Sequence, residues 1–142
     1  MRRSAASLSI ALGLLLGGCR LFGRGIRVED AWVRPALAGS NSAVYFRLVN
    51  HGQSDQLIAV RTEAAPEAAV HRTRMDAQGR LHMQAQEAVD IPQDGEVVFE
   101  PGGLHVMLLG VTRDLLLDEL ISITLVFEKG GEMAIDVPVE SR

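Results

Sequence analysis

Short apolar segments, each followed by residues that favour turns, are the feature that most constrains how this chain folds. Clusters such as Asn50-His51-Gly52 and Pro101-Gly102-Gly103 supply the turn chemistry between them. The segments predicted as strands are residues 26–33, 42–49, 56–62, 69–75, 80–84, 96–99, 105–109, 120–128 and 132–139. Many short strands at this spacing favour an antiparallel β-sandwich or barrel. We therefore expect an all-β fold, with at most a helical turn at residues 64–69.

The length of the chain favours a single domain. It has 142 residues, a size that suits one compact domain with a sizeable core. No internal repeat or low-complexity stretch divides residues 26–142. We expect this range to form one domain.

The first residues are typical of an export signal. Met1-Arg2-Arg3 supplies positive charge, and residues 8–16 form an apolar run that is too short for a stable membrane span. The sequence Leu16-Gly17-Gly18-Cys19 follows and resembles the lipobox of bacterial lipoproteins. This pattern predicts a lipoprotein signal peptide at residues 1–18, rather than a transmembrane anchor, and a lipidated tether at residues 19–25.

Cys19 is the only cysteine of the chain. Its predicted use for lipid attachment leaves no disulfide and no thiolate metal site in the domain, whereas a free thiol or an intermolecular disulfide is the alternative. The next residue is Arg20 rather than Asp, which resembles lipoproteins sorted to the outer membrane. We expect a protein held by its lipid on the periplasmic face of a membrane, the outer one if the cell has two.

Charge and composition exclude several classes of function. Without residues 1–18, which contain Arg2 and Arg3, 12 basic and 18 acidic residues remain, a net charge of −6. Such a chain has no electrostatic basis for binding nucleic acid. Aromatic residues make up 4% of the chain, which argues against a surface for stacking bases or sugars. The sequence also lacks a nucleophile–base arrangement, a phosphate loop and a zincin motif, so we do not expect an enzyme.

His105 and Met107 lie two residues apart in a predicted strand. Side chains with this spacing share one face of the strand, with Cβ atoms about 6 to 7 Å apart, so both could bind one metal ion. Val106 and Leu108 then face the core on the other side. We expect the face with His105 and Met107 to be open to a metal or a partner.

Residues 69–84 are predicted to form a hairpin around the turn at residues 76–79. If Gly79 is the left-handed residue of a three-residue loop, His71 lies opposite Met83. A loop with an even number of residues would place them on opposite faces. The first arrangement, which we expect, brings a second histidine and a second methionine onto one face.

Two imidazoles and two thioethers, without a thiolate, form a soft and neutral ligand set. Thioether sulfur favours Cu(I) over Zn(II), Mg(II) or Ca(II), and imidazole binds copper in either oxidation state. These ligands also avoid the disulfide formation that disables thiolates in an oxidising compartment. We expect one Cu(I) per domain. Each methionine, considered alone, has an alternative role in packing the core. The alternative role of each histidine is that of a solvated or hydrogen-bonded residue.

Other His, Met and Trp residues have different expected roles. Met75 shares a strand face with His71 but lies about 13 Å away, so we expect it to pack rather than to bind the same ion. His51 and His82 are expected to be solvated, and Trp32 and Met133 to lie in the core.

The spacing His71, eleven residues, Met83, twenty-one residues, His105-Val106-Met107 resembles the signature of the periplasmic PCu(A)C copper chaperones. Other stretches similar to that family are spread over residues 26–140. They are Ala31-Trp32-Val33-Arg34-Pro35, Ala43-Val44-Tyr45-Phe46, the run from Pro101 to Gly110, Phe127-Glu128-Lys129 and Val137-Pro138-Val139.

The resemblance implies a cupredoxin-like β-sandwich that binds Cu(I) through His71, Met83, His105 and Met107. It also implies delivery of copper towards the binuclear centre of cytochrome c oxidase, with subunit II of the oxidase or a thiol-bearing copper chaperone as the acceptor. The residue after the first histidine is often Met in the family and is Arg72 here, so we expect no fifth ligand at that position.

The expected mechanism is a handover from a site near the surface. Exposed neutral ligands would pass Cu(I) by stepwise exchange to an acceptor with stronger thiolate donors. A copper-buffering lipoprotein and a metal-free structural lipoprotein are the alternatives. An electron-transfer cupredoxin needs a cysteine thiolate with two histidines, which the predicted use of Cys19 excludes.

Overall fold

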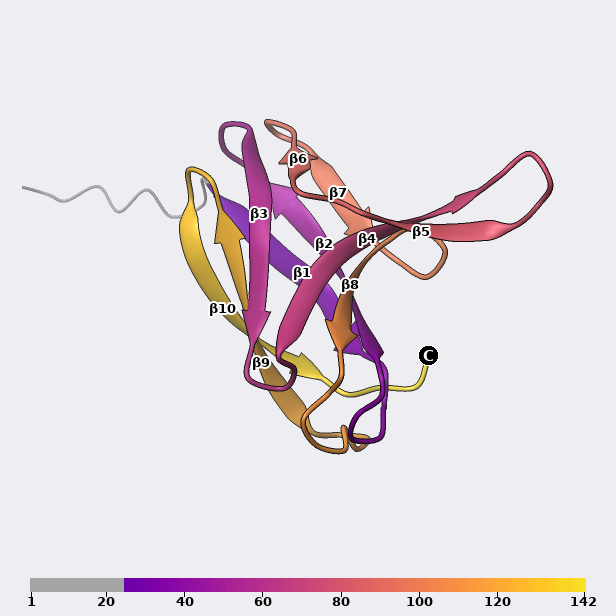
Figure 1. The fold of residues 1–142 in the computed structure, drawn as a ribbon. Helices are drawn as coiled ribbons and strands as arrows, with labels where there is room; N and C mark the ends of the chain where they lie inside the picture. Colours follow the sequence, from indigo (N-terminus) through magenta and orange to yellow (C-terminus); the bar gives the residue numbers. More distant parts are fainter. Residues whose placement is uncertain (1–24) are drawn as a thin grey trace, which may run out of the picture.

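A computed structural model describes residues 25–142, which form ten β-strands in two layers (Figure 1). The strands are β1 (Ile26–Val33), β2 (Ser42–Asn50), β3 (Asp55–Thr62), β4 (Glu67–Met75), β5 (Leu81–Ala85), β6 (Val89–Ile91), β7 (Glu96–Phe99), β8 (Leu104–Leu109), β9 (Leu120–Phe127) and β10 (Gly131–Pro138). None of the described residues is helical, so this part of the chain has no helix able to cross a membrane. The predicted signal peptide at residues 1–18 and the lipid attachment at Cys19 lie outside the described residues.

The strands form a sandwich of two sheets. The larger sheet has six strands in the order β1-β2-β7-β8-β4-β5, and the smaller has four in the order β10-β9-β3-β6. Neighbouring strands are antiparallel, except that β7 and β8 meet in a short parallel contact at Phe99 and Leu104. The predicted all-β antiparallel sandwich is therefore confirmed.

The nine predicted strands are all present, with every end within two residues of its expected position. The helical turn considered for residues 64–69 is wrong, because residues 63–66 form bends that lead directly into β4. The sequence prediction also missed β6, in which Val89 and Ile91 are buried while Asp90 is exposed. A strand of three residues is too short for its alternation to stand out from a loop.

The hydrophobic core lies between the two sheets and fixes the direction of β8. Val106 and Leu108 are fully buried there, together with Ile123 and Leu125 of β9 from the opposite sheet. Burial of such a side chain contributes about 1.5–3 kcal/mol each. Because successive strand residues point to opposite faces, His105 must project from the outer face of the larger sheet.

The outer face of the larger sheet carries a second, smaller apolar cluster. Trp32, Ala43 and Tyr45 are buried in it, separately from the main core. Trp32 is thus buried as predicted, but beside the sheet rather than inside the sandwich. On β2, Tyr45 alternates with the core residues Val44 and Phe46, so this strand is buried on both faces.

Strands β4 and β5 leave the sandwich as a projecting hairpin (Figure 1). Strand β4 pairs with β8 from Glu67 to Arg72 and with β5 from His71 to Met75. Beyond Arg72 the only strand paired with β4 is β5, although Thr73 N–H still donates to the Gly103 carbonyl at 3.1 Å. We refer to this two-stranded projection, residues 73–83, as the arm. All five residues of β5 are exposed.

The turn of the arm is organised by Asp76. Its backbone N–H donates to the Arg80 carbonyl at 2.9 Å, and Gly79, with φ at +76°, donates to the Asp76 carbonyl at 3.0 Å. The Asp76 carboxylate also accepts hydrogen bonds from the side chains of His82 and Arg80, both at 2.8 Å. The hydrogen bond from His82, followed by those from Arg80 and Gln78, lowers the pKa of Asp76. Gly79 takes the left-handed conformation that the sequence predicted.

Candidate metal centre

His71 and His105 face each other across the pairing of β4 with β8. The two residues are direct partners in the antiparallel register. Their rings stack with centroids 6.0 Å apart and planes inclined by 21°. His105 is only 3% exposed, whereas His71 is half-buried. The structure thus brings together the two histidines that the sequence selected.

The turn before β8 fixes the tautomer of His105. Residues 100–103 form a tight turn in which Gly102 has φ at +83°, and Gly103 N–H donates to the Glu100 carbonyl at 3.0 Å. The Gly103 carbonyl lies 3.1 Å from His105 Nδ1. A carbonyl only accepts hydrogen bonds, so Nδ1 must carry the proton. The lone pair of a neutral imidazole is then on Nε2, which is the arrangement found in metal-binding histidines.

Two imidazole nitrogens of this pair have no hydrogen-bond partner. Among the described residues, only Arg47 Nε, His71 Nδ1 and His105 Nε2 are buried side-chain nitrogens without one. A buried polar atom left unpaired costs about 1–3 kcal/mol. Two of the three fall on adjacent rings, which is the pattern expected where an additional group completes the site.

Met107 extends the same face of β8. It is partly buried and lies opposite Ala43 on one side and Ala69 on the other. Because alanine side chains end at Cβ, both neighbours leave space beside the flexible thioether. Val106 and Leu108 point into the core, as the sequence predicted for the residues that alternate with His105 and Met107.

Met83 reaches this face from the arm, although not with the predicted partner. The register pairs Thr73 with Met83 and His71 with Ala85, so the expectation that His71 lies opposite Met83 is wrong. The hairpin is shifted by two residues because the Asp76–Arg80 pair closes the turn. A shift by an even number preserves the face. His71 and Met83 therefore lie on one face, as diagonal rather than direct neighbours.

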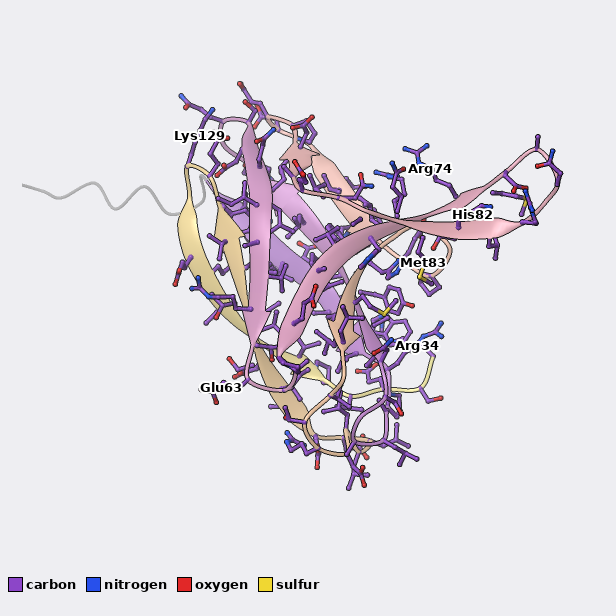
Figure 2. All side chains as sticks on the ribbon, viewed as in Figure 1. Arg34, Glu63, Arg74, His82, Met83 and Lys129 are labelled. Carbon is purple, nitrogen blue, oxygen red and sulfur yellow. The ribbon has the colours of Figure 1, made fainter. Side chains whose placement is uncertain are left out.

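An open groove connects the residues of this face. Its volume is about 620 Å³, and it lies between the larger sheet, the arm and the turn before β8. His105, Met107 and Met83 line it, together with Arg34, Pro35, Asn41, Ser42, Ala43, Tyr45, Thr73, Leu81, Pro101 and Gly102. Figure 2 shows Met83 on the side of the arm that faces the body, with Arg34 beyond it on the body. His71 lies beside His105 and is not among the lining residues.

The exposure of the four residues differs from the expectation of exposed ligands. Met83 is 60% exposed and His105 is 3% exposed. The prediction that the ligands are all exposed is wrong, because β8 is paired on both of its sides and its outer face is covered by neighbouring side chains. The site has a buried end at β8 and an open end at the arm.

The aromatic cluster forms the wall beside His105. The Tyr45 ring centroid lies 6.4 Å from that of His105 and 4.7 Å from that of Trp32. The guanidinium of Arg34 lies over Tyr45, and that of Arg142 over Trp32, each at 5.5 Å from the ring centroid. Tyr45 and Arg34 were not predicted as site residues. Tyr45 borders the site because β2 pairs with β8, and Arg34 because its backbone N–H, just after β1, donates to the Ala43 carbonyl of β2.

The ligand types at the groove suit a soft metal ion. No carboxylate lines it, and Arg34 is its only charged lining residue. Within residues 25–142, no three His, Cys, Asp or Glu side chains gather as a metal-binding group. Hard cations prefer oxygen ligands, whereas thioether with imidazole favours Cu(I).

The remaining histidines lie away from the groove. His82 alternates with Met83, and Figure 2 shows it on the opposite side of the arm together with Arg74. His82 bonds to Asp76, and His51 bonds to Arg27. Both are exposed, as predicted.

The two other described methionines differ from each other. Met133 packs partly buried against the main core, in agreement with the prediction. Met75 was expected to pack, and this is wrong, because its side chain is 68% exposed on the arm.

Comparisons with known sequences find similarity to lipoproteins. The family model "Putative lipoprotein LpqE-like" matches residues 26–139. A protein of Leifsonia xyli subsp. xyli named "Putative lipoprotein Lxx21020" is 30% identical over 117 residues, which cover 82% of this chain and 70% of that protein.

Two solved structures are similar over nearly all of their length. The apo PCuAC domain from PmoF1 has a TM-score of 0.70 and 29% identity, covering 82% of this chain and 94% of that domain. The copper-bound PCuAC domain from PmoF2 has a TM-score of 0.68 and 29% identity, covering 85% of this chain and 97% of that domain.

Proposed function

This chain belongs to the LpqE-like lipoprotein family and has the fold of a PCuAC domain, and from that premise we propose that it binds one Cu(I) ion and carries it to another protein. The ligands in this proposal are His71, Met83, His105 and Met107. The copper-bound state of a similar domain supports the choice of metal.

The observation that carries the proposal is the pair of unpartnered imidazole nitrogens. His71 Nδ1 and His105 Nε2 are buried without a hydrogen bond, on the same sheet face as two thioether sulfurs. Imidazole nitrogen and thioether sulfur are both acceptable to Cu(I). A bound ion would therefore satisfy polar atoms that folding alone leaves unpaired.

Among the four proposed ligands, His105 is the one whose orientation and tautomer are fixed before a metal binds. The Gly103 carbonyl holds its Nδ1 proton, and burial holds the ring against β4. Such an outer hydrogen bond orients the ring and raises the basicity of the ligating nitrogen. His105 and Met107 would hold the ion, while Met83 would close the site from the arm.

The handover starts, in this proposal, at the exposed end. Met83 is accessible to an incoming protein, whereas His105 is not. A thiolate of the acceptor would replace Met83 first and the buried ligands afterwards. Thiolate binds Cu(I) more strongly than thioether, which sets the direction of transfer. Cu(I) keeps its oxidation state throughout, so the step needs no electron donor.

We propose a thiol-bearing copper chaperone or subunit II of cytochrome c oxidase as the acceptor. The support is the resemblance of the His71–Met107 motif to that of the PCu(A)C chaperones. A deletion strain should lose oxidase activity under copper starvation and regain it when copper is added. Normal oxidase activity combined with sensitivity to excess copper would favour a buffering role instead.

Membrane attachment through Cys19 is the proposed location. The lipobox-like sequence and the membership of a lipoprotein family support it. We expect cells to incorporate labelled palmitate into the protein, and Cys19→Ser to abolish the label. We also expect the protein on the periplasmic face, in the outer membrane of a cell with two, and protease treatment of spheroplasts tests its orientation.

A competition titration against a chromophoric Cu(I) chelator, without oxygen, tests the binding proposal. We expect one tight site, which the double variant Met83→Leu/Met107→Leu weakens about a hundredfold, or about 2.7 kcal/mol. The matched control Met75→Leu/Met133→Leu removes the same number of thioethers outside the site and should keep the wild-type affinity. Equal affinities for the two double variants would overturn the proposed ligand set.

A further inference from the structure

The arm carries a thioether that the proposed site does not use. Met75 is 68% exposed near the tip of the arm, and Met83 is 60% exposed nearer to the sandwich. The register pairs Met75 with Leu81 and Thr73 with Met83. Met75 and Met83 are therefore diagonal neighbours on one face of the hairpin, a separation of about 7–8 Å that long side chains can bridge.

The chemistry of this arm face suits Cu(I) and little else. Thr73 and Leu81 accompany the two thioethers, whereas Arg74 and His82 project from the other side (Figure 2). The Asp76 carboxylate is occupied by Arg80 and His82. No charged side chain shares the face with Met75 and Met83, so their sulfurs are the available soft ligands.

The methionine and histidine side chains form a gradient of exposure from the arm to the sandwich. Exposure falls from 68% at Met75 to 60% at Met83 and 3% at His105. Met107 lies between these extremes, partly buried beside His105. Met83 lines the groove together with His105 and Met107, and Met75 is the next soft ligand along the arm in the outward direction.

Resting on the proposed function, we propose that Met75 and Met83 form a second, outer Cu(I) site through which the ion enters and leaves the inner one. In this step Met83 keeps its bond to the ion, Met75 sulfur binds, and the histidines and Met107 are released. Cu(I) remains Cu(I), and no proton is transferred. Two thioethers bind more weakly than the complete inner set, so the outer site is occupied only in transit or at excess copper.

Methyl NMR of the full chain labelled with ¹³C at its methionines tests the outer site directly. Cu(I) is added as its acetonitrile complex without oxygen. We expect the first equivalent to shift the methyl signals of Met83 and Met107, and the second to shift Met75 and Met83. Met133, packed against the core in β10, serves as the internal control and should not move.

Transfer kinetics give the second readout. Met75→Leu should leave the affinity of the inner site unchanged and slow the transfer of Cu(I) to a chromophoric chelator about tenfold. The swap Met75→Leu/Leu81→Met returns a thioether to the same face from the directly opposite position. It should restore the rate to within about threefold of the wild type.

The outcomes separate the two proposals. If Met83 and Met107 respond to the first equivalent but Met75 never does, or if Met75→Leu transfers Cu(I) at the wild-type rate, the outer site is overturned alone. If no methionine methyl responds to the first equivalent, the proposed function falls and the outer site with it. A Met75 shift that accompanies slower transfer by Met75→Leu supports both.

Discussion

Strand β8 and the arm contribute to the same face in opposite ways. Strand β8 is paired on both sides within the larger sheet, and its alternate residues Val106 and Leu108 are fully buried. Strand β5 is an edge strand whose residues are all exposed. The position of His105 is thus set by the core, whereas that of Met83 depends on a two-stranded ribbon. In the proposed function, this difference would let the buried end retain the ion while the open end exchanges it.

We expect the largest loss of Cu(I) affinity from a substitution at the buried end of the site. His105→Ala should lower Cu(I) affinity about a thousandfold, or about 4 kcal/mol, because it removes a ligand whose orientation and tautomer are already fixed. The chelator competition measures it, with thermal unfolding as a check that the variant is folded. His82→Ala, on the other side of the arm, should retain wild-type affinity. A similar loss in both variants would show that the effect is not specific to the groove.

Two aspartates test whether the arm and the sandwich are independent in stability. Asp55 accepts hydrogen bonds from the backbone of Gln56, Lys129 and Gly130, and so ties β3 to the turn between β9 and β10. We expect Asp55→Ala to lower the free energy of unfolding by about 1–3 kcal/mol, since the buried Asp55 carboxylate and its three part-buried hydrogen bonds are lost together. Asp76→Ala should leave the global unfolding transition unchanged. Urea denaturation measures both, and a matching loss for Asp76→Ala would contradict the separation.

Asp55 also makes the stability of the sandwich depend on pH. Burial acts to raise the pKa of Asp55, but the N–H donors of Lys129, Gln56 and Gly130 outweigh it, so the pKa is lowered. A lowered folded-state pKa means that the stabilisation is present above the ordinary Asp range and is lost as the pH falls through the folded value. The difference in unfolding free energy between the wild type and Asp55→Asn should therefore shrink below about pH 4. A difference that grows on acidification would contradict this account.

The open end of the site should tolerate substitution better than the buried end. Met83→Leu alone should reduce Cu(I) affinity about tenfold, or about 1.4 kcal/mol, because the exposed thioether is only partly fixed before binding. Leu81→Ala, on the same face of β5 but without a ligand atom, provides the control and should retain the affinity. If Met83→Leu costs as much as His105→Ala, the two ends do not differ in the way proposed.

The smallest expected effect comes from the turn of the arm. Gly79 has φ at +76°, and a Cβ added there would contact no neighbouring atom. An alanine would nevertheless be strained, because residues with a Cβ rarely adopt this positive φ. Gly79→Ala should loosen the arm, which hydrogen exchange of its amides would detect, and reduce Cu(I) affinity about threefold, or about 0.6 kcal/mol. Gly25→Ala, where Cβ also meets open space without a positive φ, is the matched control.

The sequence was most informative where one local rule applied. Alternation alone predicted that His105 and Met107 share a face opposite Val106 and Leu108, and the burial of the two core residues agrees. The hairpin needed a second rule, the geometry of the turn. The choice of Gly79 was correct, but the Asp76–Arg80 pair shifted the register by two residues.

Features that depend on pairing between distant strands could not be predicted from the sequence. Tyr45 borders the site only because β2 pairs with β8, and no local pattern reports that pairing. The exposure of Met75 has a similar origin. Packing was expected because Met75 lies too far from His71 to bind the same ion, but β4 no longer pairs with β8 beyond Arg72, so the outer half of the strand has no sheet to pack against.

X-ray absorption at the copper K-edge of the Cu(I)-loaded protein tests the central claim most directly. The account predicts a first shell that contains both nitrogen and sulfur, with the sulfur contribution lost in Met83→Leu/Met107→Leu and retained in Met75→Leu/Met133→Leu. A first shell of nitrogen and oxygen alone, or a sulfur contribution that survives in Met83→Leu/Met107→Leu, would contradict a site built from His71, Met83, His105 and Met107.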